Sequence, residues 1–203
     1  MNSNILFHEY LGKLDEQLKG YNIPLNKLLQ EGISRDFIDD KIRNTPISFF
    51  DELYDLYAWR NGTRYEDGIT YDQTWLFPGA CLLSIEDSLE YYNYDKRDTF
   101  WKDTMFGLFD SGGGDMYLID CDEKSPTFKM LIRHNVAAVD YEVVITAYDS
   151  LASLFKTITE CYETGVFYFD PSGALQSDFK GQIRIARRNN PQSDLWKLYD
   201  WVD

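Results

Sequence analysis

The sequence has only three cysteines, two histidines and no long apolar run. The cysteines, Cys81, Cys121 and Cys161, are far apart and form no Cys-x-x-Cys pair. This pattern argues against a disulfide framework or a zinc site and favours a reducing compartment. No apolar run approaches the roughly 18 residues of a transmembrane helix, and the first residues lack the basic start and apolar core of a signal peptide. We therefore expect a cytoplasmic protein that does not contact membranes.

Signatures of phosphate binding are also missing. Three glycines, Gly112, Gly113 and Gly114, separate two strand-like runs in GLFDSGGGDMYLIDCD (107–122). A Walker A loop would need a lysine followed by Ser or Thr, and a dinucleotide loop would need to open a helix. Here an acid, Asp115, and then a strand-like run follow the glycines. We interpret the glycines as a hairpin turn with positive φ, and we expect no cofactor.

Catalytic and metal-binding signatures are weak. There is no Gly-x-Ser-x-Gly motif, and neither His8 nor His134 has a companion motif for nucleophilic catalysis. The run DCDEKSP (120–126) lacks the central glycine and the closing glutamate of a calcium loop. Strand alternation puts Asp120 and Asp122 on one face, where a solvated edge is the simplest interpretation and a catalytic carboxylate pair the alternative. We expect no metal and no enzymatic activity, with a carboxylate-based hydrolase as an alternative.

Basic residues are scarce relative to acidic ones: 20 Lys and Arg stand against 34 Asp and Glu, a net charge of −14. Such a field repels nucleic acid and anionic lipid, and it attracts cationic partners. A charge of this sign can also serve only solubility. Residues 171–203 carry five basic and four acidic side chains, so the acidic excess belongs to the residues before them. We expect a basic protein partner and no binding of nucleic acid.

Hydrophobic periodicity divides the chain into helices and strands. Ser34, Ser48 and Ser84 are the expected N-caps of three helices, and Asn61-Gly62 is the expected end of the second of these. Tight turns predict antiparallel hairpins in the sheet. Helices are expected within 3–19, 33–43, 45–63, 85–98 and 150–165, and strands within 74–79, 81–84, 104–110, 116–122, 128–134 and 141–148. Residues 166–201 read as a short strand, a turn, a basic strand and a short amphipathic helix.

Two stretches without basic residues combine acids with large aromatics. The first lies between Arg64 and Lys96, and the second runs from Asp110 to Glu123. Aromatics can anchor a protein interface and carboxylates can steer a basic partner, although a solvated rim around core aromatics is the simpler interpretation. The first stretch holds Tyr65, Glu66, Asp67, Tyr71, Asp72, Trp75, Glu86, Asp87, Glu90, Tyr91, Tyr92, Tyr94 and Asp95. As candidate partner-binding residues we select Glu66, Asp67, Tyr71, Asp72, Trp75, Asp110, Asp115, Asp120 and Asp122.

Four motifs occur in an order that resembles the SUKH superfamily, the SMI/KNR-like group of bacterial immunity proteins that also contains a fungal regulator of cell-wall synthesis. They are LYDLYAWRNGT, WLFPGACLLSIEDSLEYY, FGLFDSGGGDMYLIDCD and SLASLFKTI, within residues 30–165. The matching positions that we expect to be structural are Trp59, Asn61, Gly62, Phe77, Pro78, Gly113 and Gly114. Leu76, Leu83, Ser84, Phe109, Asp115 and Asp120 match as well. The glycine that usually follows the DCDEKSP turn is missing.

The resemblance implies an α+β fold with helices packed against a mainly antiparallel central sheet. It divides the chain into a SUKH-like domain (1–170) and a basic C-terminal extension (171–203), which we expect to pack on the same domain. It also implies a non-catalytic immunity protein that binds and neutralises a toxin domain, in many cases a nuclease, delivered by a neighbouring cell. An acidic protein could occupy the basic groove of a nuclease. An intracellular regulatory scaffold with the same fold is the alternative from another class.

Overall fold

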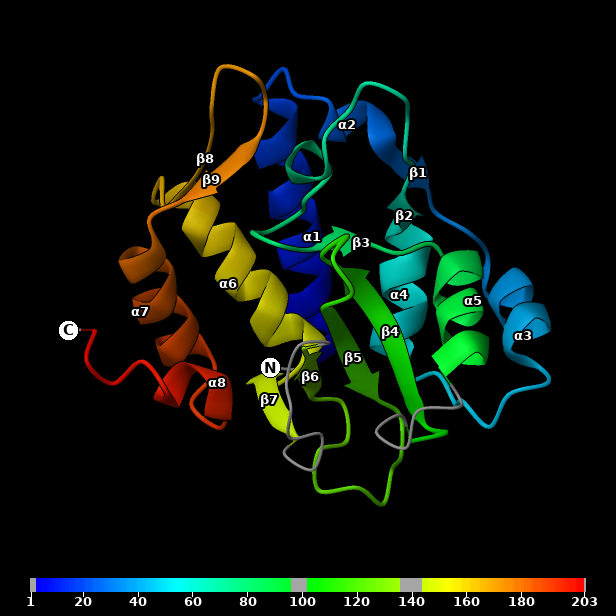
Figure 1. Ribbon diagram of the computed structural model, residues 1–203. Coiled ribbons are helices and arrows are strands. Elements are labelled where there is room, and N and C mark those ends of the chain that lie inside the picture. The colour runs from blue at the N-terminus through cyan, green and yellow to red at the C-terminus, as the bar shows by residue number, and fades with distance from the viewer. Residues whose placement is uncertain (1–2, 96–101, 136–143, 203) are drawn as a thin grey trace.

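Helices pack against one face and the edges of a central β-sheet in the computed structural model, which describes residues 3–95, 102–135 and 144–202 (Figure 1). The helices are α1 (Ser3–Lys19), α2 (Leu25–Leu28), α3 (Arg35–Ile42), α4 (Asp51–Trp59), α5 (Ile85–Asp95), α6 (Leu151–Glu163), α7 (Phe179–Asn189) and α8 (Asp194–Lys197). The strands are β1 (Leu29–Glu31), β2 (Arg60–Thr63), β3 (Cys81–Leu82), β4 (Met105–Asp110), β5 (Met116–Asp120), β6 (Leu131–His134), β7 (Ile145–Tyr148), β8 (Phe167–Phe169) and β9 (Leu175–Ser177). A 3-10 turn, η1 (Tyr71–Gln73), precedes β3.

The central sheet has the order β3-β4-β5-β6-β7, and every neighbouring pair in it is antiparallel. Two small antiparallel pairs, β1-β2 and β8-β9, lie outside it. The β4-β5 hairpin turns at the glycines: Gly112 and Gly114 have φ values of 79° and 94°, and the Ser111 N–H donates to the Asp115 carbonyl at 3.0 Å. The predictions of an α+β fold and of a glycine hairpin are both confirmed.

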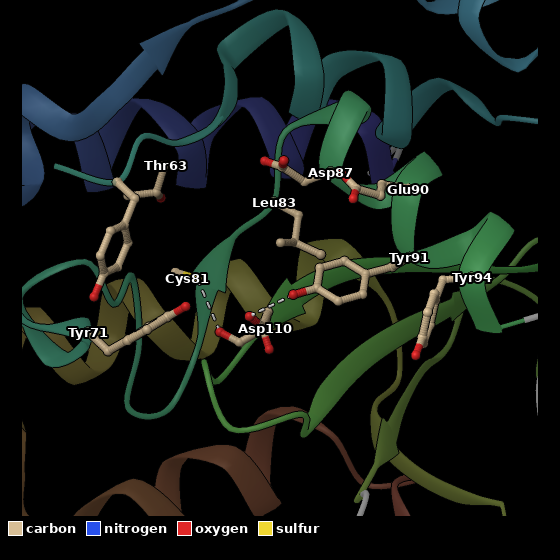
Figure 2. A pocket seen from close by; sticks show the side chains of 10 residues that line it. Thr63, Tyr71, Cys81, Leu83, Asp87, Glu90, Tyr91, Tyr94 and Asp110 are labelled. Atoms are coloured by element: carbon tan, nitrogen blue, oxygen red, sulfur yellow. Dashed lines mark hydrogen bonds between the residues drawn. The ribbon is translucent and has the colours of Figure 1, made fainter.

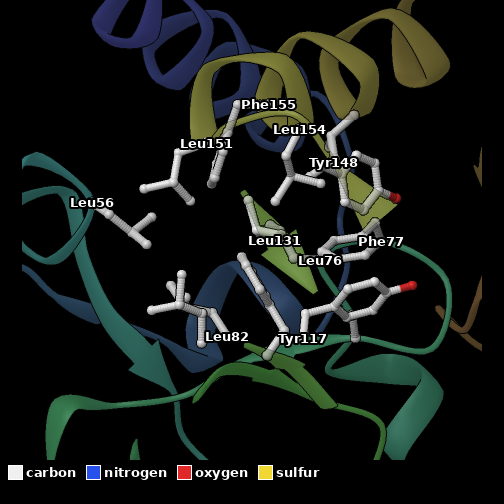
Figure 3. Packing of buried hydrophobic residues seen from close by; sticks show 14 of the residues in the cluster. Leu56, Leu76, Phe77, Leu82, Tyr117, Leu131, Tyr148, Leu151, Leu154 and Phe155 are labelled. Carbon is white, nitrogen blue, oxygen red and sulfur yellow. The ribbon is translucent and has the colours of Figure 1, made fainter. Parts of the chain in front are cut away.

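The main core lies between one face of the sheet and helices α1, α4 and α6. Helical spacing in α6 turns Leu151, Leu154 and Phe155 toward Tyr117 and Leu131 of the sheet (Figure 3). These side chains are nearly fully buried, and the Phe155 ring also meets the rings of α1 and α4 edge-on. Deleting one such ring from a packed core typically costs about 3–5 kcal/mol. The core therefore fixes how the sheet sits on its helices.

Two of the three expected caps are present. The Ser34 hydroxyl accepts the Phe37 N–H at the start of α3, and the Ser84 hydroxyl accepts the Asp87 N–H at the start of α5. The prediction for Ser48 is wrong, because α4 begins two residues after the expected start, with Phe50 at the N-cap and no side-chain cap. Phe50 stays extended there while its ring packs edge-on against Phe128.

Two further local predictions are wrong. Asn61 and Gly62 do not end α4, because the helix stops at Trp59 and the chain continues directly into β2. The expected strand within 74–79 is only a tight turn with a single bridge between Phe77 and Ala80. Phe77 still points into the main core. The run around it is too short to form a strand paired with a neighbour. The end of the expected helix within 85–98 and the start of the expected strand within 141–148 lie outside the described residues.

The last segment packs against α6 and β7. The Asp178 carboxylate caps α7 by accepting the Lys180 N–H, and the Trp196 indole N–H donates to the Ala147 carbonyl at 2.5 Å. The expected basic strand is therefore a helix. Ile183 and Ile185 alternate with arginines as in a strand, yet the run is also compatible with a helix, and the Asp178 cap favours the helical form.

Candidate functional site

A pocket of about 460 Å³ opens on the face of the sheet opposite the main core, beside α5 (Figure 2). Its floor comes from β3 and β4, one wall from α5, and the other from the segment that runs from the end of β2 to η1. We refer to it as the tyrosine pocket. The described residues that line it are Thr63, Tyr65, Tyr71, Cys81, Leu83, Asp87, Glu90, Tyr91, Tyr94 and Asp110.

The floor depends on strand alternation and on one β-bulge. Leu82 of β3 faces the main core, so its neighbours Cys81 and Leu83 face the pocket. In β4, Gly107 pairs with Leu118 and Phe109 pairs with Tyr117, which leaves one extra residue between the pairs. This bulge reverses the alternation, so that Phe109 enters the core and Asp110 faces the pocket.

The α5 wall is positioned by β2. Asn61 Oδ1 accepts the Ile85 N–H at 3.0 Å, in addition to the Ser84 cap. Gly62, with φ of 84°, lies so close to this point that a Cβ there would stand 2.2 Å from Ser84 N. The start of α5 is thus fixed directly on β2, which gives the Asn-Gly motif its structural role.

One face of α5 supplies four lining residues. Asp87, Glu90, Tyr91 and Tyr94 are spaced at i, i+3, i+4 and i+7, which places them on one helical stripe. Figure 2 shows Tyr91 and Tyr94 on the side of the pocket away from Tyr71. A single helix face therefore brings two carboxylates and two aromatic rings to the pocket.

The opposite wall rests on the glycine turn. The Tyr65 and Tyr71 rings pack with centroids 4.8 Å apart. A Cβ on Gly112 would stand 2.3 Å from the Tyr71 ring, so the backbone of this glycine forms the seat of that ring. Gly112 is therefore required for two reasons. A side chain would collide with the Tyr71 ring, and the positive φ of this turn favours glycine.

Burial dominates the electrostatics of the floor. Asp110 is only 5% exposed, and this burial raises the pKa of its carboxyl although the backbone N–H groups of Gly112 and Ser111 and the Tyr91 hydroxyl oppose the shift. Burial and the nearby Asp110 raise the pKa of Tyr91 to about 12, and burial raises the pKa of Cys81 to about 12. The phenol and the thiol therefore stay protonated at neutral pH.

Negative charge in the pocket has no basic counterpart on the described chain. None of the described lining residues is basic, and Asp87, Glu90 and Asp110 make no ion pair with a described residue. Their neighbours differ: Glu66 pairs with Arg64 at 2.6 Å and Glu86 pairs with Lys41 at 3.2 Å. Among the described residues, Glu66 and Glu86 beside the pocket thus have basic partners, whereas the acids that line the pocket have none.

The predicted partner-binding residues are only partly brought together. Tyr71 and Asp110 line the pocket, and the exposed Glu66 and Asp67 lie on the segment next to Tyr65. Asp72 lies in η1 beside Tyr71, and Trp75 is half-buried against the main core. Asp115 lies beyond the glycine turn, 3.5 Å from Arg133, and lines a different hollow. Asp122 is half-buried in the turn after β5.

Asp120 corrects the expectation of a solvated edge at the end of β5. Its side chain is fully buried. Oδ1 accepts the Asp122 N–H at 2.9 Å, and Oδ2 accepts the Thr127 hydroxyl at 2.7 Å. Asp120 thus holds the following turn together and is not accessible to a partner, so it neither shares a solvated face with Asp122 nor forms a carboxylate pair there.

The α5 residues of the pocket belong to the first stretch without basic residues that the sequence analysis identified. They were not among the candidate partner-binding residues selected from it. The signal that could have found them is the helical stripe of Asp87, Glu90, Tyr91 and Tyr94. Among the residues that the structure describes, no group of three or more His, Cys, Asp or Glu side chains is placed to hold a metal ion. Within the same ranges, every helix is too short or too polar to cross a membrane.

Comparison with protein families places most of the chain in a known family model. The model described as SMI1 / KNR4 family (SUKH-1) matches residues 32–156, more than half of the 203-residue chain. This range includes β2, η1, α5 and the β4-β5 hairpin, and so it contains every described residue of the tyrosine pocket. No curated protein matches the chain.

Proposed function

The chain belongs to the SMI1/KNR4 family (SUKH-1), a family known for immunity-protein-like domains, and from this premise we propose that it is a non-enzymatic immunity protein. It binds a cognate toxin domain of a bacterial polymorphic or contact-dependent toxin system and thereby blocks it. The complex is stoichiometric and forms in the cytoplasm. Three buried cysteines that are free thiols support a reducing location.

The acidic, tyrosine-lined surface around the pocket carries the proposal. Tyr65, Tyr71 and Tyr94 are 53%, 42% and 74% exposed, and they gather around one pocket. Rigid aromatics of this kind supply contact area at protein interfaces, and the carboxylates beside them favour a cationic partner. A nuclease domain is such a partner, because it needs basic residues to hold phosphate. Charge complementarity therefore favours a basic toxin.

One observation favours the alternative of a carboxylate hydrolase. The pocket combines carboxylates with tyrosines, and the raised pKa of Asp110 is a property of general acids. Against it, the Asp110 carboxylate is hydrogen-bonded by backbone N–H groups, and Asp87 is engaged by the Ser84 hydroxyl at 2.6 Å. Turnover of aryl glycosides that disappears in Asp110→Asn would establish the hydrolase. A regulatory scaffold, the other alternative, would bind an intracellular partner through the same surface.

Charge reversal on this surface tests the proposal. Asp67→Lys combined with Glu90→Lys changes two exposed acids that make no ion pair with a described residue. We expect protection of cells that co-express the toxin domain encoded beside this chain to be lost. Affinity measured by calorimetry should fall about 100-fold or more, because like charges facing each other across an interface cost several kcal/mol.

The matched control reverses two exposed acids elsewhere. Glu16→Lys and Glu163→Lys lie on α1 and α6, which cover the other face of the sheet, and they change the net charge equally. The control should protect cells as the wild type does. If both double variants lose protection equally, only net charge matters and the assignment of the surface is wrong. If neither does, the toxin binds elsewhere.

A further inference from the structure

We propose that the tyrosine pocket receives one arginine side chain of the protein partner. The inference rests on the proposed function, since it names the group through which the partner is recognised at that same site. Three features of the pocket carry it: aromatic rings on two sides, carboxylates without a basic counterpart on the described chain, and apolar side chains on the floor beside Asp110.

The aromatic rings frame a space suited to a flat cation. Figure 2 shows Tyr71 on one side and Tyr91 and Tyr94 on the other, with Leu83 and Asp110 between them. A cation within about 6 Å of a ring centroid is attracted by the negative face of the ring. A guanidinium group is planar and can also stack on the ring, which an ammonium group cannot do.

The carboxylates provide the charge that a cation requires. Asp87 and Glu90 are exposed on α5, whereas Asp110 is 5% exposed at the floor. Burial raises the pKa of Tyr71 and of Tyr91, so these two phenols can donate a hydrogen bond but supply no negative charge. An anionic ligand would be repelled by three acids, and a buried carboxylate without a cation nearby is costly to keep ionised. An incoming guanidinium would relieve that cost at Asp110.

The shape of the pocket suits a long side chain with an apolar stem. Leu83 and Cys81 face the interior of the pocket between the polar groups. The Cys81 thiol donates a hydrogen bond to the backbone carbonyl of Asp110 at 3.2 Å. Arginine can lay its methylene groups on such a surface while its head reaches the acids. The head has five donors in a fixed fork that matches carboxylates, compared with three on a strongly hydrated lysine.

The chain uses the same arrangement within its own structure. The Arg35 guanidinium lies 3.8 Å from the centre of the Tyr54 ring and 3.4 Å from the Asp51 carboxylate. Tyrosine and carboxylate together thus hold an arginine at the surface of this fold. The tyrosine pocket offers more rings and more acids than that site, and its arginine is missing from the described chain.

The test titrates the full chain with Nα-acetyl-arginine-N-methylamide and follows the Tyr91 and Tyr94 ring signals by NMR. The citrulline analogue, which has nearly the same shape without the charge, is the matched control ligand, and the lysine analogue is the second. We expect saturable shifts with the arginine probe, binding several-fold weaker with lysine and none with citrulline. The pKa of Asp110 should fall when the arginine probe binds, because a cation favours the ionised form.

Two exposed substitutions remove the expected contacts with little risk to the fold. Glu90→Gln and Tyr94→Leu should each lower the affinity for the arginine probe about fivefold or more, whereas Glu16→Gln on α1 should leave this affinity unchanged. Equal binding of the arginine and citrulline probes, or shifts that do not map to the pocket, would overturn the proposal. So would tighter binding of lysine than of arginine.

A second measurement separates this inference from the proposed function. In the purified complex, replacing each surface arginine of the toxin domain by alanine should identify one whose loss is coupled to Glu90→Gln in a double-mutant cycle. If the toxin binds tightly but no arginine couples, the immunity function stands and the arginine site is wrong. If the probe binds but no toxin domain does, the arginine site stands and the immunity function is wrong.

Discussion

At the scale of single residues, two motif glycines support the pocket through close contacts. Gly112 makes room for the Tyr71 ring, and Gly62 lets β2 lie against the first residues of α5. Both have positive φ, which other residues adopt only at a cost. From the sequence, each glycine predicts only a turn. The close contact that each one allows is made with a segment distant in sequence, which the sequence does not indicate.

Gly62→Ala should lower the free energy of unfolding by well over 1 kcal/mol. The substitution adds the strain of positive φ, about 1–2 kcal/mol, to a clash between the new Cβ and the backbone of Ser84 at 2.2 Å. Urea denaturation followed by tryptophan fluorescence measures the change. The control is Gly68→Ala: Gly68 has φ of 83° but nothing within 4 Å of a new Cβ, so it isolates the strain. Equal losses of unfolding free energy in the two variants would show that β2 is not in close contact with the start of α5.

At the scale of elements, α5 is the segment on which the site depends. Its N-terminus is held by Ser84 and Asn61, and its stripe supplies two acids and two rings of the pocket. Loosening its first turn should affect stability and partner binding together, because the pocket residues start at its third position.

Ser84→Ala should lower the free energy of unfolding by about 1 kcal/mol, the usual cost of losing a side-chain cap. Ser48→Ala is the matched control, since Ser48 is exposed and does not cap α4. It should change stability by less than about 0.5 kcal/mol. Thermal and urea unfolding of both variants measure the difference. A loss at Ser48 as large as at Ser84 would contradict the assigned caps.

Local periodicity was sufficient to predict α1, α3, α4, α5 and α6, the antiparallel hairpins and the turn at the glycines. It failed where tertiary contacts decide. Residues 183–186 satisfy a strand and a helix pattern, and only the Asp178 cap and the packing on α6 select the helix. The β4 bulge is invisible in the sequence, since simple alternation from Phe106 would direct Asp110 into the core. Asp120 could not be recognised as buried, because its partners come from a turn without periodicity.

At the scale of the whole molecule, charge is distributed unevenly. The acidic excess lies before residue 171, and the tyrosine pocket lies beside α5 near β3 and β4. The basic residues of α7 lie at the other edge of the sheet, past β7 (Figure 1). A basic toxin domain approaching the molecule would therefore be attracted toward the pocket and repelled from α7. Electrostatic steering of this kind weakens as salt is added.

The most direct test of this account is a calorimetric titration of the purified chain with the toxin domain encoded beside it, at low and at high salt. We predict tight one-to-one binding whose affinity falls as salt rises, together with loss of toxin activity at one equivalent. An absence of heat and of inhibition at both salt concentrations would contradict the immunity function. Tight binding that is indifferent to salt would contradict the electrostatic mechanism and leave the function in place.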